Sequence, residues 1–182
     1  RHGKVIAEGA YAPYRLEIPH MLYSMSKSVT GLAVGIASDE GYLDINERLV
    51  EIFPEYVTNS NAKTLRTLTL KHLLTMSSGI RFNEVGSGLD ENWMKMFMQS
   101  VPRFEPGTEF EYNSLNSYVL AAAVVKRTGM SLVDYLTPRL FEPLGIRYHE
   151  WEKCPMGIEK GGWGLSLTAE DAAKLGQLCM NM

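Results

Sequence analysis

Residues 23–31 read Tyr23-Ser24-Met25-Ser26-Lys27-Ser28-Val29-Thr30-Gly31. Apolar residues recur at helical spacing from Val29 to Ile36, which predicts a helix over residues 24–40 with Gly41 as its C-terminal stop. Ser24 and Lys27 stand three positions apart, so a helix places the hydroxyl and the amine on one face. The first backbone N–H groups of a helix have no partner within it. This pattern supplies the geometry of a serine–lysine pair.

Gly31 and Gly35 stand four residues apart within the expected helix. Glycine weakens a helix by about 1 kcal/mol relative to alanine, so we expect this helix to owe its stability to burial on several sides. Two glycines on one face also let another backbone pack closely. The helix is therefore predicted to be central and buried.

Composition bounds the class of protein. The chain has 182 residues, of which 45% are apolar and 21% charged, and its net charge is -3. These values are typical of one globular domain and exclude a disordered tail, a collagen-like repeat and a coiled coil. The mild charge, without a basic run, argues against nucleic acid as the main partner. Every apolar stretch is under ten residues long, too short to cross a bilayer.

The cysteines and the first residue bear on the compartment. Cys154 and Cys179 cannot form a disulfide scaffold and lack the spacing of a zinc site. Two cysteines that read as free thiols favour a cytoplasmic location for the protein. The chain opens with Arg1 rather than Met, so we expect that its start is not the natural one and that any leader would precede it.

The remaining pattern is rich in helix and poor in strand. Residues 4–10 read as a short strand, and a glycine- and serine-rich loop is expected over 83–90. Further segments with helical spacing lie at 69–76, 93–100 and 115–128.

Two pairs of residues predict where later helices begin. Ser131 with Asp134, and Thr168 with Asp171, have the spacing of a capping box. We expect one helix to start at each pair.

Common catalytic motifs are missing from the sequence. The four histidines are scattered and no G-x-S-x-G elbow occurs, so a Ser-His-Asp triad is unsupported. His72 stands beside Leu73 and Leu74 on an expected helix and is predicted to be a hydrogen-bonded core residue or a support for the site. The glycine-rich stretch over 161–164 fits neither the dinucleotide-binding nor the Walker pattern.

A serine–lysine mechanism remains open. A serine nucleophile needs a proton acceptor, and a neutral lysine serves where desolvation and the positive end of a helix favour the neutral amine. Ser24 and Lys27 fit this S-x-x-K pattern, but so do Ser60 and Lys63, which lie in a polar run that reads as a solvated turn. The pattern alone is therefore weak, and the alternative for Ser24 is a helix N-cap beside an exposed lysine.

A second motif strengthens the first. Tyr112-Asn113-Ser114 follows the Pro106-Gly107 turn and precedes a helix. A phenol beside an ammonium can relay a proton, and a short hydroxyl can bridge a lysine to the tyrosine or to a leaving group. The alternatives are an amphipathic residue at the core edge for Tyr112 and a helix cap for Ser114.

Five stretches resemble the landmarks of the penicillin-recognising serine hydrolases, in the branch of class C β-lactamases, DD-peptidases and related esterases. The first is residues 23–31, quoted above. The others read Lys71-His72-Leu73-Leu74-Thr75-Met76-Ser77-Ser78-Gly79, Pro106-Gly107-Thr108-Glu109-Phe110-Glu111-Tyr112-Asn113-Ser114, Pro143-Leu144-Gly145 and Gly161-Gly162-Trp163-Gly164-Leu165-Ser166-Leu167-Thr168-Ala169. They occur in the family's order and spread over nearly the whole chain.

The resemblance implies a fold and a set of roles. The fold would be α/β (α+β), of the serine β-lactamase/DD-peptidase type, with most of the helical lobe and an incomplete antiparallel sheet. Ser24 would be the acylated nucleophile, Lys27 its base and Tyr112 the partner in proton transfer, with Ser114 in the third place of the tyrosine motif. The backbone N–H of Ser24 would form half of an oxyanion hole. No metal or organic cofactor is implied.

The chain departs from the family pattern in two places. Class C β-lactamases usually have asparagine where this chain has Ser114, whereas Asn113 stands one place early. The third family motif, Lys or His then any residue then Gly, is matched in letters by Lys160-Gly161-Gly162 and nearly by Arg127-Thr128-Gly129, and we interpret both as structural.

These departures lead to an expectation about completeness. We expect a single partial domain, with residues 1–20 as a remnant of the sheet lobe, 24–182 as mainly helical lobe, and the later strands and third motif beyond Met182. Such a chain would be stable only with a companion, either the rest of the protein or another copy.

The function expected is hydrolysis of a β-lactam, a D-alanyl peptide or a related amide or ester, so the partner is a small molecule or peptide. One alternative is a carboxylesterase, favoured by Ser114 and by a cleft wall of Trp93, Met96 and Phe97, although we interpret these three residues as core in preference to a cleft wall. The other is a penicillin-binding sensor or scaffold that is acylated without turnover.

Overall fold

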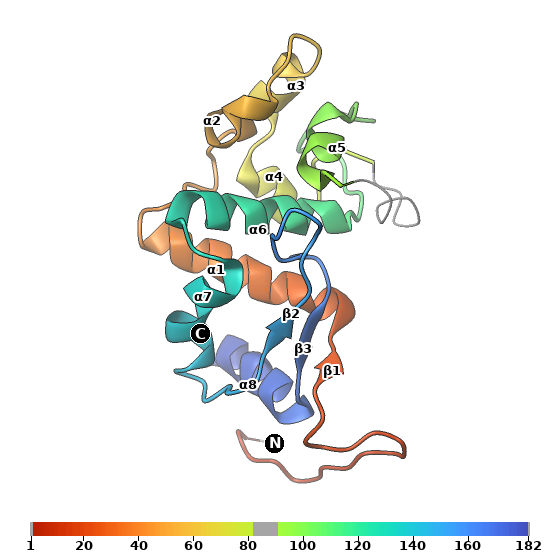
Figure 1. Cartoon of the computed structure of the whole chain (residues 1–182), viewed down its shortest axis with the longest axis vertical. Coiled ribbons are helices and arrows are strands. Elements are labelled where there is room, and N and C mark those ends of the chain that lie inside the picture. Colours follow the sequence, from red (N-terminus) through yellow and green to blue (C-terminus); the bar gives the residue numbers. More distant parts are fainter. Residues whose placement is uncertain (1, 82–90, 182) are drawn as a thin grey trace.

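The computed structural model describes residues 2–81 and 91–181 (Figure 1). Two long helices, α1 (Ser26–Asp39) and α6 (Ser114–Thr128), pack along each other across the middle of the molecule. A group of short helices lies on one side of this pair, and the sheet with the last helices lies on the other. The pair therefore forms the central layer on which the rest of the chain is arranged.

Helix α6 is the most buried element. Every residue from Ser114 to Val124 is buried, as expected of a helix that contacts neighbours all round. It ends at Gly129, where the sequence predicts the stop.

Helix α1 is confirmed, but its predicted burial on several sides is wrong. It buries Val29, Ala33 and Ala37 among the core residues. A Cβ placed on Gly31 or Gly35 would have nothing within 4 Å among the described residues. The two glycines thus face open space rather than a closely packed backbone, and burial on one side suffices to hold the helix.

The short helices fill the side of α6 away from α1. They are α2 (Leu49–Ile52), the 3-10 turn Pro54–Tyr56, α3 (Ala62–Thr67), α4 (Leu70–Leu74) and α5 (Trp93–Gln99). Helices α4 and α5 are those predicted over 69–76 and 93–100. The loop predicted over 83–90 lies outside the described residues. Trp93 and Phe97 are buried in the core and Met96 packs against it, so the interpretation of these residues as core is confirmed and the alternative of a cleft wall is wrong.

The other side holds the later helices, and both predicted capping residues are confirmed. Ser131 accepts a hydrogen bond from the backbone N–H of Asp134 at the start of α7 (Leu132–Leu136), which runs into a π-helical turn, Thr137–Phe141. Thr168 accepts one from the N–H of Asp171 at the start of α8 (Ala169–Met180).

A small antiparallel sheet adjoins the N-terminal end of α1. Its strands are β1 (His20–Met21), β2 (Glu150–Trp151) and β3 (Leu165–Leu167), in the order β1-β3-β2, with His20 opposite Leu167 and Glu150 opposite Ser166. The molecule is therefore mainly helical with a small antiparallel sheet, as predicted.

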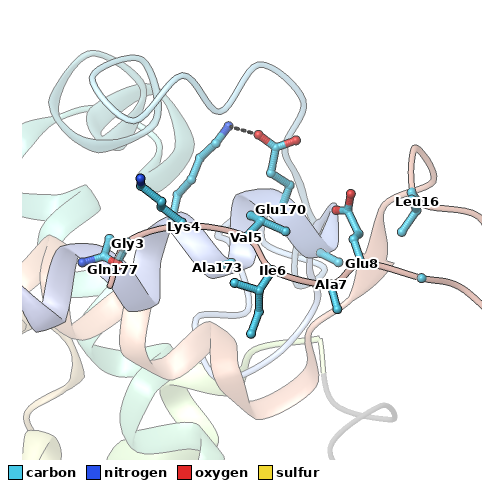
Figure 2. Close-up of a pocket in the computed structure, with 13 residues that line it drawn as sticks. Gly3, Lys4, Val5, Ile6, Ala7, Glu8, Leu16, Glu170, Ala173 and Gln177 are labelled. Carbon is cyan, nitrogen blue, oxygen red and sulfur yellow. Dashed lines mark ion pairs between the residues drawn. The ribbon is translucent and has the colours of Figure 1, made fainter. Parts of the chain in front are cut away.

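The strand predicted over residues 4–10 is wrong. This segment is extended and exposed, but it has no ladder partner among the described residues, and a strand exists only through such pairing. Figure 2 shows the segment crossing α8, where it borders a groove of about 660 Å³. The division into a sheet-lobe remnant and a helical lobe stays a prediction.

Two further findings concern membrane-spanning helices and the cysteines. Within residues 2–81 and 91–181, no helix combines the length and the apolar character that a membrane span requires. Cys154 is buried and Cys179 exposed, and both are free thiols.

Candidate active site

Ser24 lies where the sheet meets α1. The backbone N–H of Leu22 donates to the Leu165 carbonyl of β3 (2.8 Å), and the chain then forms the 3-10 turn Tyr23–Met25 that leads directly into α1. Tyr23 has a left-handed backbone (φ 46°), which costs a non-glycine residue about 1 kcal/mol. Such strained residues cluster at functional sites. This one turns the chain so that the exposed Ser24 stands just ahead of the helix.

Lys27 and Tyr112 converge on Ser24. The Lys27 Nζ donates to the Ser24 Oγ at 3.0 Å, from one helical turn away. The Tyr112 hydroxyl donates to the same Oγ at 2.7 Å, and the Lys27 Nζ lies 4.8 Å from the centre of the Tyr112 ring. A hydroxyl, an amine and a phenol thus form one hydrogen-bonded group, which is the arrangement expected from the sequence.

The amine has a further partner that the sequence did not point to. Lys27 Nζ donates to the Gly162 carbonyl at 2.7 Å, and the Thr30 hydroxyl donates to the Gly161 carbonyl at 2.8 Å. These two bonds attach the loop between β2 and β3 to α1. The first of them adds a second acceptor for the Lys27 amine beside the Ser24 Oγ.

Only glycine allows this loop to come so close. A Cβ on Gly161 would lie 2.5 Å from the Ser117 carbonyl oxygen, and a Cβ on Gly162 would lie 2.5 Å from that of Ser114. The paired glycines were the available signal in the sequence. Their pattern indicates a close approach, but it does not tell which side chain receives the carbonyls.

The charge around Tyr112 changes its acidity. Partial burial alone would raise the pKa of the Tyr112 phenol, but hydrogen bonds to Lys27, Ser24 and Ser114, together with the positive charge of Lys27, bring it below its usual value. The phenol therefore loses its proton more readily than an isolated tyrosine. It is suited to exchange a proton with the Ser24 hydroxyl.

The group is open to solvent on one side. Ser24 is exposed, Lys27 is half-buried and the Tyr112 side chain is 52% exposed. Ser24 and Tyr112 therefore face solvent, while Lys27 lies partly beneath them in the interior.

Ser114 and Asn113 have different positions. Ser114 is the buried first residue of α6 and reaches the group through its hydrogen bond to Tyr112. The Asn113 amide accepts from the Leu115 N–H (2.8 Å) and donates to the Ile80 carbonyl (2.6 Å), so it caps α6 rather than entering the group. The asparagine that stands one place early is thus structural.

His72 is a hydrogen-bonded structural residue, as predicted. Its Nδ1 accepts from the Thr69 backbone N–H at 3.2 Å. Burial, and then the charge of Lys71, lower the pKa of the His72 imidazole despite an opposing backbone hydrogen bond.

The remaining candidates lie apart from the group. Lys160 is paired with Glu152 (2.5 Å), and the Arg127-Thr128-Gly129 stretch ends α6. Ser60 shares a hydrogen bond with Thr58 and Lys63 is exposed. In the described part of the chain, no cluster of three His, Cys, Asp or Glu side chains has the arrangement of a metal site.

Comparisons with known proteins bear on the family and the fold of the chain. A model of the Beta-lactamase family matches residues 1–177. The chain is 30% identical over 148 residues to a "Beta-lactamase" of Escherichia coli strain K12, which covers 79% of this chain and 37% of that protein. It is 28% identical over 132 residues to "Protein flp" of Staphylococcus aureus strain MW2, which covers 69% of this chain and 26% of that protein.

A solved structure gives the same fold. The "Putative 6-aminohexanoate-dimer hydrolase from Bacillus anthracis" superposes with a TM-score of 0.83 at 22% identity, over 96% of this chain and 51% of that one. The chain thus spans between 26% and 51% of the lengths of these three relatives.

Proposed function

Because this chain belongs to the Beta-lactamase family, we propose that it carries the nucleophile of a serine hydrolase that acts through an acyl-enzyme. The observation that supports the proposal best is the convergence of two donors on one hydroxyl oxygen. Lys27 Nζ at 3.0 Å and the Tyr112 hydroxyl at 2.7 Å both contact the Ser24 Oγ. A nucleophile within hydrogen-bond reach of its base, with the base held by a third group, is the usual geometry of covalent catalysis.

Acylation follows from these contacts. The O–H bond of Ser24 breaks, its proton passes to the Lys27 amine or the Tyr112 phenolate, and the Oγ bonds to the carbonyl carbon of the substrate. The proton then passes to the leaving nitrogen or oxygen as its bond to that carbon breaks. Water later attacks the acyl ester on Ser24 with the same groups as base, which releases the acid and restores the serine hydroxyl.

Two backbone groups assist these steps in the proposal. The Gly162 carbonyl keeps the Lys27 amine beside Ser24. The backbone N–H of Ser24 donates to the developing oxyanion, an interaction whose loss typically costs about 3 kcal/mol of transition-state stabilisation. The proposed steps use only a hydroxyl, an amine and a phenol, with no metal or organic cofactor.

The substrate proposed is a β-lactam, a D-alanyl peptide or a related linear amide or ester. Two relatives are named for hydrolysis, one as a "Beta-lactamase" and the other as a "Putative 6-aminohexanoate-dimer hydrolase". A carboxylesterase of the same family remains the alternative that Ser114 favours, since a hydroxyl replaces the usual amide there. We propose further that the rest of a longer protein, or another copy, completes the site.

Acyl transfer is tested by trapping the intermediate in the full protein. Mass spectrometry after brief incubation with a penicillin and with a p-nitrophenyl ester is expected to find one acyl group on Ser24, absent from Ser24→Ala. The matched control is Ser60→Ala, the serine of the second S-x-x-K stretch, which is expected to label as the wild type does. Labelling that survives in Ser24→Ala would overturn the proposal.

Turnover separates the enzyme from the alternatives. Steady hydrolysis of a chromogenic cephalosporin supports a lactamase, and steady hydrolysis of esters alone supports the esterase. A single stoichiometric burst supports a penicillin-binding sensor that is acylated without turnover.

A further inference from the structure

The position of the Tyr112 side chain depends on the backbone around it rather than on the packing of the side chain itself. It lies in the irregular segment over residues 100–113, between α5 and α6, and half of its side chain faces solvent. Its hydroxyl nevertheless reaches a serine 88 positions earlier in the chain. An exposed side chain on an irregular segment keeps such a position only if the backbone on both sides is fixed.

The segment is attached at three points to one turn, which we call the 76–80 turn. Backbone N–H groups of Arg103, Gly107 and Glu111 donate to three carbonyls of this turn. The acceptors are Gly79 (2.9 Å), Ser77 (2.8 Å) and Met76 (2.9 Å) respectively. The last bond fixes the residue immediately before Tyr112.

The residue immediately after Tyr112 is fixed by the same turn. Asn113 donates its side-chain N–H to the Ile80 carbonyl at 2.6 Å while it caps α6. Ser78 donates its hydroxyl to the Asn116 amide oxygen at 2.9 Å and accepts from the Ile80 N–H at 3.2 Å. Ser78, Asn113 and Asn116 are at most 2% exposed. Breaking one of these bonds therefore leaves a polar group unpaired in the interior.

The 76–80 turn is itself rigidly placed. The Ser77 N–H donates to the His72 carbonyl of α4 at 2.8 Å. Gly79 has a left-handed backbone (φ 72°), and a Cβ there would lie 2.5 Å from the Phe104 carbonyl oxygen. The turn therefore connects the segment that carries Tyr112 to α4, so the position of α4 fixes the position of that segment.

We infer that the 76–80 turn and Asn113 form a clamp that positions the Tyr112 phenol on the Ser24 Oγ. The clamp assigns a role to the 71–79 stretch, which the proposed reaction does not use directly. Ser78 and Asn113 are positioning residues, since neither contacts the Ser24 Oγ. The effect on catalysis rests on the proposed function, whereas the effect on the placement of Tyr112 does not.

The test compares Asn113→Ala with a matched control. Asn61 is also buried, at 6% exposure, and its side chain binds the Tyr56 carbonyl (2.9 Å), the Met98 carbonyl (3.0 Å) and the Thr58 N–H (2.7 Å). Asn61→Ala therefore removes a similar set of buried bonds far along the chain from Tyr112. Each variant carries 3-fluorotyrosine, and Tyr112→Phe identifies the Tyr112 signal in the ¹⁹F spectrum.

Asn113→Ala is expected to shift the Tyr112 signal and to raise the pKa of that phenol towards the ordinary value, because the bonds to Lys27 and Ser24 loosen. The acylation rate is expected to fall about 10- to 100-fold, with less than a twofold change in KM, as for a misplaced catalytic group. Asn61→Ala is expected to lower the melting temperature to a similar extent and to change neither the signal nor the rate.

An unchanged Tyr112 signal in Asn113→Ala would overturn the clamp, as would an equal shift in Asn61→Ala. Asn113→Ser covers the case in which the alanine variant does not fold, since serine keeps the helix cap but drops the donor to Ile80. If the wild type is never acylated, the proposed function fails, while the ¹⁹F signal still decides whether the clamp positions Tyr112.

Discussion

The Tyr112 hydroxyl lies 2.7 Å from the Ser24 Oγ, on the same oxygen that accepts from Lys27. The contact joins the start of α1 to the segment before α6, and those two helices pack along each other. The relative placement of two packed helices thus sets the distance between two solvent-accessible groups. Damage to the core can therefore change the site without touching it.

Removal of the amine is the most direct test of the proposed base. Lys27→Ala is expected to lower the rate of acylation by about 10³-fold, because proton transfer by a positioned side chain contributes about that much. The rate is measured by the appearance of acylated protein in mass spectra. Lys63→Ala, the exposed lysine of the second S-x-x-K stretch, is the control and is expected to react at the wild-type rate. Equal rates in Lys27→Ala and Lys63→Ala would refute the assigned role.

If the proposed function holds, the pH dependence of acylation is expected to be set in part by Tyr112. Hydrogen bonds and the charge of Lys27 outweigh burial and lower the pKa of this phenol. A phenol accepts the serine proton only after it has lost its own, so acylation is expected to fall as pH falls through that pKa. This acidic limb of the pH profile should lie below the pH at which free tyrosine titrates, about 10. It is measured as kcat/KM against pH, and Tyr112→Phe is expected to lack it.

The parts of the fold that the sequence predicted best are those with local signals. Thr168 and Ser131 begin their helices as their capping spacing indicates, and Gly129 ends α6. The serine, lysine and tyrosine of the candidate site were likewise identified from short motifs. Their meeting across 88 residues followed from the family resemblance rather than from spacing.

The parts that were missed depend on contacts between distant segments. Residues 4–10 have the composition of a strand, but strand formation requires a partner that composition does not reveal. Gly31 suggested a packed backbone, whereas its neighbourhood is open. The Gly162 carbonyl was missed because every residue has a carbonyl, and only the tertiary fold selects which one meets Lys27.

Two glycines of opposite surroundings predict opposite effects of alanine. Gly162→Ala puts a Cβ 2.5 Å from the Ser114 carbonyl oxygen, so the loop must shift relative to α6, and the Gly162 carbonyl that binds Lys27 shifts with it. We expect a loss of about 1–3 kcal/mol in the free energy of unfolding and a 10- to 100-fold slower acylation. Gly35→Ala adds a methyl group to α1 where nothing lies within 4 Å among the described residues. It is expected to raise the free energy of unfolding by about 0.5–1 kcal/mol. Urea unfolding measures both, and a loss of stability in Gly35→Ala would contradict the open face of α1.

A partly buried histidine predicts how stability changes in mild acid. His149 stacks on Phe141 with ring centres 4.3 Å apart, and within the described residues its Nδ1 has no hydrogen-bond partner. Burial lowers the pKa of the His149 imidazole, although the charge of Asp171 opposes the change. The unfolded chain then binds more protons than the folded one between the lowered pKa and the ordinary value of about 6.5.

The stability linked to neutral His149 is therefore expected to be fully present above about pH 6.5 and to decline as pH falls below that value. The measurement is the melting temperature between pH 8 and pH 5, compared between the wild type and His149→Phe. The variant should lose less stability on acidification, because phenylalanine keeps the stacking on Phe141 and has no proton to bind. His72, whose pKa is also lowered by burial, accounts for part of the remaining decline. His2→Gln, at an exposed position, serves as the control. A steeper decline in His149→Phe than in the wild type would show that the protonated ring stabilises the fold, contrary to this prediction.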